Sequence, residues 1–141
     1  MTSDRREIVV MAGDTTIART TRGVRILETA SPPTVYLPPG DVRMDLLERT
    51  GGRSYCEWKG SAVYWNVRAP GAAPVLRAGW SYPQPMPPFD GVQDYLSFYP
   101  GRLACFIGGV RVSPQPGGFY GGWLTPEIVG PVKGESGTEG W

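Results

Sequence analysis

The sequence predicts a mostly β protein built from short strands joined by tight turns. Gly and Pro account for 20 and 15 of the 141 residues, and such a content disfavours long helices. Residues 6–20 contain an apolar run, a Gly-Asp turn and a Thr-rich run, and residues 102–112 repeat this outline around Gly108-Gly109, a pattern typical of a β-hairpin. Hydrophobic residues make up 40% of the chain, which is enough for one core. We therefore expect one domain of antiparallel sheets.

Further strands are predicted between the two hairpins. Each is a short run rich in β-branched, aromatic or other apolar residues and bounded by Gly, Pro or polar residues. They cover residues 23–29, 34–38, 53–59, 61–68 and 75–82.

One short helix is predicted to begin at Asp41. Asp is a favourable N-cap residue, and Val42 and Leu46 lie four residues apart, as on the buried face of a helix. The helix is expected to end near Gly51. It would place the carboxylates of Asp41, Asp45 and Glu48 on one side, where they either hold a hard cation or form a solvated face paired with nearby arginines.

A second short helix is predicted after Asp90. Its apolar residues follow the i, i+3, i+4, i+7 spacing of an amphipathic helix, and Pro100 and Gly101 would end it. The residues on this face are Val92, Tyr95, Leu96 and Tyr99.

The last 28 residues differ in character from the rest. Residues 114–141 are rich in Gly and Pro yet retain aromatic and apolar side chains such as Phe119, Tyr120 and Trp123, which a flexible tail would lack. We therefore divide the chain into a β-rich domain, 1–113, and an irregular arm, 114–141. The arm is expected to pack on the domain or on the second subunit of a homodimer.

Charge and hydropathy exclude several classes of partner. With 14 basic and 13 acidic side chains the net charge is +1, so no global field attracts nucleic acid or an anionic membrane. The chain has neither the apolar segment of a signal peptide nor the run of about 18 to 20 apolar residues of a membrane span. A cytoplasmic location is the expectation.

The absence of histidine limits the chemistry. The chain has no His and only two cysteines, Cys56 and Cys105, so neither a Ser-His-Asp triad nor a zinc site of four Cys or His ligands can form within it. We expect no metal and no cofactor. The two cysteines are predicted to be reduced, since a lone pair in a chain without a secretion signal is more often free than bonded.

The candidate site lies around residues 55–65, YCEWKGSAVYW. Strand alternation places Trp58 and Tyr64 on one face, with small residues between them that leave room beside the rings. Together with Trp80 and Tyr82 they are predicted to form the walls of a ligand groove in which Lys59 binds an anionic or carbonyl group. The alternative is that these rings, with Trp65, simply form the core, since aromatic side chains more often fill a β core than a ligand site.

A catalytic alternative uses the same segment. Cys56 and Lys59 are the candidate nucleophiles, because they are close in sequence and a nearby cation favours the reactive thiolate.

The segments LPPGDVRMDLLE, YCEWKGSAVYW, AGWSYPQPMP and YLSFYP, in this order, resemble a bacterial and fungal family described as domain of unknown function number 427. The resemblance covers most of residues 8–112. It implies a compact β-tent, or Mss4-like, fold; the zinc-binding relatives of that fold use paired Cys-x-x-Cys ligands that this chain lacks. Matching positions are Glu28, Tyr36, Pro38, Asp41, Cys56, Lys59, Gly60, Tyr64, Trp80, Tyr82, Pro83 and Tyr99.

Three functions remain open from the sequence. The first is a small-molecule binding module with an aromatic-walled groove. The second is a dimerising or protein-interaction module that uses the arm. The third is an enzyme, either with a Cys or Lys nucleophile or a nucleotidyltransferase, as the family's label implies. Nucleotide transfer normally needs metal-binding carboxylates near a Gly-Ser turn, and Gly60-Ser61 is not followed by an Asp-x-Asp pair.

Overall fold

The computed structural model describes residues 2–26, 34–56, 60–85, 89–114 and 123–124. These residues form three antiparallel sheets and a two-stranded ribbon, and their only helical segments are short 3-10 turns. The prediction of a mostly β, antiparallel fold is confirmed. No helix within these ranges is both long and apolar enough to cross a membrane.

Both predicted hairpins are present, and they share one sheet with the order β11-β10-β2-β3. Gly13 in the first turn and Gly108 and Gly109 in the second have positive φ angles, a backbone region that glycine enters without steric cost. The strands are β2 (Ile8–Ala12), β3 (Thr15–Thr20), β10 (Ala104–Ile107) and β11 (Val110–Arg111).

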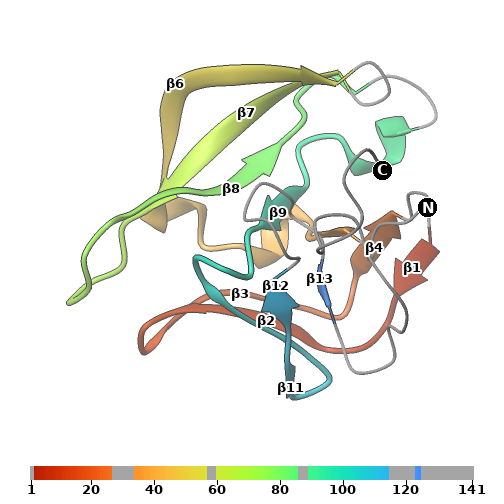
Figure 1. The fold of residues 1–141 in the computed structure, drawn as a ribbon. Helices are drawn as coiled ribbons and strands as arrows, with labels where there is room; N and C mark the ends of the chain where they lie inside the picture. The colour runs from red at the N-terminus through yellow and green to blue at the C-terminus, as the bar shows by residue number, and fades with distance from the viewer. Residues whose placement is uncertain (1, 27–33, 57–59, 86–88, 115–122, 125–141) are drawn as a thin grey trace, which may run out of the picture.

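Two further sheets complete the domain, in the orders β1-β4-β5 and β6-β7-β8-β9. In Figure 1 the long strands β6, β7 and β8 lie on one side of the molecule, β2 and β3 on the other, and β9 between them. A bridge between Leu37 and Leu96 connects β9 to the end of β5. The strands are β1 (Thr2–Asp4), β4 (Gly23–Ile26), β5 (Thr34–Tyr36), β6 (Leu47–Cys56), β7 (Gly60–Val67), β8 (Val75–Ser81) and β9 (Leu96–Phe98).

The predicted helix after Asp41 is wrong in kind. Two single 3-10 turns, η1 (Pro39–Asp41) and η2 (Met44–Leu46), occupy the segment, and β6 begins directly after them. Val42 bridges to Ala18, and the Arg43 N–H donates to the Ile17 carbonyl over 2.7 Å. The backbone groups that would continue a helix are therefore bonded to β3.

The second predicted helix is also reduced to one turn, η3 (Phe89–Val92). Asp94 has a φ of 63°, and a residue in this left-handed region cannot continue a right-handed helix. The chain then becomes β9, in which Leu96 and Phe98 face the main core. The helix-like spacing arises because the residues of this segment are divided between two cores. Val92, Tyr95 and Tyr99 pack around Trp80, whereas Leu96 packs in the main core.

The buried side chains form two groups. The main core packs the sheet of β2, β3 and β10 against β9 and parts of β5, β7 and β8. It contains Cys105, which is a free thiol, as expected, and whose pKa is raised to about 12 because the side chain is buried. The second group surrounds Tyr36, Trp80 and Tyr82.

Part of the arm packs within its own chain. The ribbon pairs β12 (Ser113–Pro114) with β13 (Trp123–Leu124). The Trp123 side chain is in the main core, and its Nε1–H donates to the Phe98 carbonyl over 3.0 Å. The rest of the arm lies outside the described residues, so the homodimer stays a prediction.

Candidate functional site

The second core is a cluster of aromatic rings contributed by strands far apart in the sequence. In the strand register Tyr64 of β7 lies opposite Trp80 of β8, and Trp80 lies opposite Ser97 of β9. Directly opposed residues of antiparallel strands project from the same face. The three side chains therefore form a row across the sheet.

The rings meet in edge-on and tilted geometries. The centroid of Trp80 lies 6.2 Å from that of Tyr36, edge to face, and 4.6 Å from that of Tyr99. Tyr82 lies 6.5 Å from Tyr36. The Trp80 Nε1–H points to the Tyr36 hydroxyl, with 3.3 Å between the two atoms. We call this group, with its apolar neighbours, the aromatic cluster; it contains Val24, Ile26, Tyr36, Ala62, Tyr64, Trp80, Tyr82, Val92, Tyr95 and Tyr99.

The cluster is buried at its centre and open at its rim. Tyr36 is fully buried, and Trp80 and Tyr82 are each only 7% exposed. Tyr64, Tyr95 and Tyr99 are partly exposed. A ligand would therefore approach the cluster beside these three rim rings, with Trp80 behind them.

A polar atom is buried in this apolar setting. The Ser97 side chain is 0% exposed, and its hydroxyl has no hydrogen-bond partner within the described chain. Its neighbours in β9, Leu96 and Phe98, face the main core. Ser97 therefore faces the opposite way, toward the aromatic cluster, as its register with Trp80 also requires.

Two arginines lie over the rim rings. The Arg77 guanidinium carbon is 4.0 Å from the centroid of the Tyr64 ring, and that of Arg102 is 5.4 Å from the centroid of Tyr99. Burial raises the pKa of the Tyr99 hydroxyl, as does the nearby Tyr64 hydroxyl, while the charges of Arg102 and Arg77 oppose this shift. Tyr64, Arg77 and Arg102 therefore all lie within electrostatic range of Tyr99 at the rim of the aromatic cluster.

The structure brings together three of the residues predicted to bind ligand. Tyr64, Trp80 and Tyr82 all belong to the aromatic cluster. The other predicted residues belong in sequence to segment 56–59, which follows or ends β6 and precedes β7.

Trp58 and Lys59 lie outside the described residues, as does the side chain of Cys56. The roles assigned to all three stay predictions.

Sequence reasoning missed Ser97, Arg77 and Arg102. Ser97 is the one polar residue of β9, between Leu96 and Phe98, and this alternation is a signal that strand periodicity could have used. No such signal exists for Arg77, because its position depends on a bulge in β8 that cannot be predicted from the sequence.

The three carboxylates considered as cation ligands are not grouped together, because each is bonded to a different partner. Asp41 accepts hydrogen bonds from Thr20 and Arg22, Asp45 pairs with Arg43, and Glu48 pairs with Arg68. In the described ranges no group of three or more Cys, Asp or Glu side chains is arranged to hold a metal ion.

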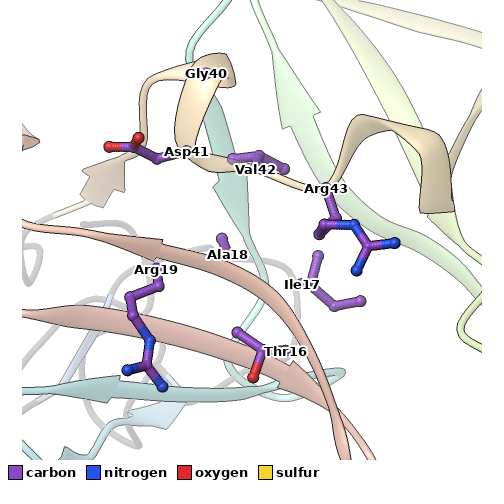
Figure 2. Close-up of a pocket in the computed structure, with 8 residues that line it drawn as sticks. All are labelled: Thr16, Ile17, Ala18, Arg19, Gly40, Asp41, Val42 and Arg43. Carbon is purple, nitrogen blue, oxygen red and sulfur yellow. The ribbon is translucent and has the colours of Figure 1, made fainter.

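A concave region lies between β3 and η1, with a volume of about 340 Å³. Figure 2 shows Val42 near Ala18 and Ile17, with Arg19 and Arg43 toward opposite ends. Backbone pairing spans this hollow, since Val42 bridges Ala18. Arg43 is paired with Asp45 at 2.8 Å. Arg19, the other arginine that lines the hollow, lies 3.9 Å from the Glu7 carboxylate, so both arginines have carboxylate partners within the chain.

Asp41, in the wall of this hollow, makes stability depend on pH. Its pKa is lowered chiefly by the hydrogen bond from the Thr20 hydroxyl, 2.6 Å away, and further by Arg22, although burial opposes the shift. Because the folded pKa lies below the unfolded one, this stabilisation is present above about pH 4 and is lost as pH falls through the folded pKa.

We expect Asp41→Asn to lower the free energy of unfolding by about 1 kcal/mol at pH 7. The deficit relative to the parent protein should shrink below about pH 4, where the parent's carboxylate also becomes protonated. Urea titrations of both proteins between pH 3 and pH 7 measure this difference. A deficit that is constant over this range would contradict the assignment.

Together these features define a class: a mostly β protein of antiparallel sheets with an aromatic cluster that reaches the surface beside two arginines. The profile of the family NTP_transf_9, domain of unknown function (DUF427), matches residues 1–108. The chain belongs to this family, as the resemblance of its motifs indicated. The comparison with curated proteins found no match.

Proposed function

We propose that the protein is a small-molecule binding module whose ligand occupies the rim of the aromatic cluster. The observation that carries this proposal is the buried Ser97 hydroxyl without a hydrogen-bond partner in the described chain. Leaving a buried polar group unpaired costs about 1 to 3 kcal/mol. Alanine would fill the same place without this cost, so we infer that the ligand moves the rim rings on binding and becomes the partner of this hydroxyl, which is fully buried in the free protein.

The surroundings of Ser97 suit a small organic ligand. Ligand sites are mostly apolar, with a few placed polar groups that fix orientation. Trp80 and Tyr36 supply the apolar walls behind the site, and Tyr64 and Tyr99 supply rings at the surface. Ser97 supplies the polar group, and Lys59, near the start of β7 in sequence, is proposed to supply a second one.

A neutral aromatic amide, benzamide, tests this proposal because it offers a ring for the walls and an amide for the Ser97 hydroxyl. We expect added benzamide to shift the amide NMR signals of Tyr64, Trp80 and Ser97. Ser97→Ala should weaken its binding roughly two- to tenfold, the value of one neutral hydrogen bond. The same variant should be as stable as the parent protein or more stable, because it removes an unpaired buried group.

Ser113→Ala, which removes an exposed hydroxyl from β12, is the matched control and should change neither quantity. The proposal is wrong if benzamide leaves the signals of the aromatic cluster unchanged. It is also wrong if Ser97→Ala destabilises the protein, since the hydroxyl would then already have a partner in the free protein.

A further inference from the structure

We infer that the ligand of this site carries an oxyanion, a carboxylate or a phosphate, and that Arg77 binds it at the rim of the aromatic cluster. This inference rests on the proposed function and adds the chemical class of the ligand. It depends on how the chain positions Arg77, on the ring below its guanidinium group, and on the absence of a carboxylate partner for Arg77 among the described residues.

The position of Arg77 is set by a bulge in β8. Trp65 pairs with Gly79 and Val67 pairs with Val75, so that three residues of β8, 76–78, lie opposite the single residue Asn66. Bulges are common next to functional sites, where they redirect a side chain.

Arg77 itself has a φ of 49°, a left-handed conformation that disfavours side chains other than glycine, asparagine and aspartate. The Asn66 side chain stabilises it by accepting a hydrogen bond from the Arg77 N–H over 2.9 Å. An arginine at a position suited to glycine indicates a role for its side chain.

The redirected side chain lies over the aromatic cluster. The guanidinium of Arg77 is stacked 4.0 Å from the centroid of Tyr64, and Tyr64 is opposite Trp80 in the sheet. Stacking on a ring restricts the guanidinium group without consuming its N–H donors. Those donors remain available to a planar or tetrahedral oxyanion, which guanidinium binds with two parallel hydrogen bonds.

Among the described residues, Arg77 has no acidic partner, unlike arginines such as Arg22, Arg43 and Arg68. It forms no ion pair with any carboxylate in the part of the chain that the structure describes. Glu48, which Asn66 also contacts, is bound by both Arg68 Nε and Arg68 Nη2, at 3.1 and 3.0 Å. The charge of Arg77 therefore remains uncompensated within these ranges.

Arg102 adds a second positive charge beside the first. Its Nη1 donates to the Leu76 carbonyl over 2.7 Å, which links it to the residue preceding Arg77, and its guanidinium lies over Tyr99. It likewise has no carboxylate partner among the described side chains. Two guanidinium groups beside the rim rings, with no carboxylate partner among the described residues, favour an anionic over a neutral or cationic ligand group.

Three probes of similar size separate the possibilities: benzoate, phenyl phosphate and neutral benzamide. We expect the two anions to bind more tightly than benzamide at the signals of Tyr64, Trp80 and Ser97. Arg77→Gln should weaken the binding of the anions about tenfold, the value of a charged hydrogen bond, and that of benzamide by less than about twofold. Whichever anion loses more affinity identifies the ligand group as a carboxylate or a phosphate.

Arg111→Gln is the matched control. Arg111 is also an exposed arginine over a ring, 5.6 Å from the centroid of Phe106, but it lies in the sheet of β2 and β3. This variant should leave the binding of all three probes unchanged. Arg77→Gly, whose backbone accepts a positive φ readily, should weaken anion binding as Arg77→Gln does, so a folding defect in one variant does not prevent the test.

The outcomes distinguish the two proposals. If benzamide and the anions bind equally well and neither Arg77 variant changes this, the oxyanion inference is wrong while the binding site stands. If none of the three probes shifts the signals of the aromatic cluster, the proposed function fails and the inference fails with it.

Discussion

Trp123→Ala is expected to lower the free energy of unfolding by about 3 to 5 kcal/mol, the usual cost of truncating a buried tryptophan. The side chain is 1% exposed in the main core, so its removal leaves a cavity among residues fixed by three sheets. The Phe98 carbonyl would also lose the hydrogen bond from the Trp123 Nε1–H. A loss of this size lowers the melting temperature on the order of 10 °C.

Two controls separate the cavity from the hydrogen bond and from surface effects. Trp123→Phe keeps part of the ring volume but lacks the donor, so it should be destabilised less than Trp123→Ala. Leu76→Ala, at a position 60% exposed, should change stability by less than about 0.5 kcal/mol. Urea titrations measure all three. If Trp123→Ala is as stable as the Leu76 variant, Trp123 is not part of the core in solution.

This result bears on how far the folding unit extends. The family profile ends at residue 108, whereas Trp123 belongs to the Gly- and Pro-rich segment that follows it. A segment of this composition needs buried apolar groups to offset its ordering entropy. A large effect at Trp123 would show that the domain requires part of the arm.

The hairpins could be predicted because their information is local. Gly13 and the pair Gly108-Gly109 supply the positive φ angles of the turns, and the flanking runs alternate between buried and less buried residues. A short window of sequence contains both signals. The strands beside these turns could therefore be predicted without information from residues far away in the sequence.

The helices were predicted wrongly because their spacing has a non-local cause. Residues 41–47 meet the helical pattern, but Val42 is paired with Ala18 and Arg43 with Ile17, more than 20 residues earlier. Backbone bonds to a neighbouring strand outweigh a weak local preference. In the second predicted helix, nothing in the sequence predicted the left-handed conformation of Asp94 that prevents the helix from continuing.

The residues of the candidate site also divide into those that local sequence predicts and those whose position depends on strand pairing. Tyr64, Trp80 and Tyr82 were predicted from alternation and large size, and they do gather in the aromatic cluster. Ser97 and Arg77 depend on cross-strand register and on the bulge in β8, which are properties of paired strands. The positions of Ser97 and Arg77 in the site can therefore be inferred only when the pairing of the strands is known.

Strand β9 connects the two cores. Leu96 and Phe98 face the main core, and Ser97 between them faces the aromatic cluster. A displacement of β9 from β8 should therefore disturb stability and ligand binding together. Gly79, opposite Phe98 in the pairing of β8 with β9, is the position that controls this distance.

Gly79→Ala is accordingly expected to have the second large effect. A Cβ atom at this position would lie 2.7 Å from the Ser97 carbonyl oxygen and 2.8 Å from Phe98 Cδ1. The first of these atoms belongs to the backbone, so β9 as a whole must move. Overpacking of this kind typically costs about 1 to 3 kcal/mol, and we expect the upper end of this range because a strand has to shift.

Benzamide binding should weaken in the same variant, because the shift separates Ser97 from Trp80, which lies directly opposite it. Gly40→Ala is the matched control: a Cβ there would meet only Arg22 Nη2, at 4.0 Å, so stability should change by less than about 0.5 kcal/mol. Urea titration and NMR titration with benzamide measure the two effects. If Gly79→Ala loses stability but binds benzamide as the parent does, β9 does not form the floor of the site, and the ligand must lie elsewhere on the aromatic cluster.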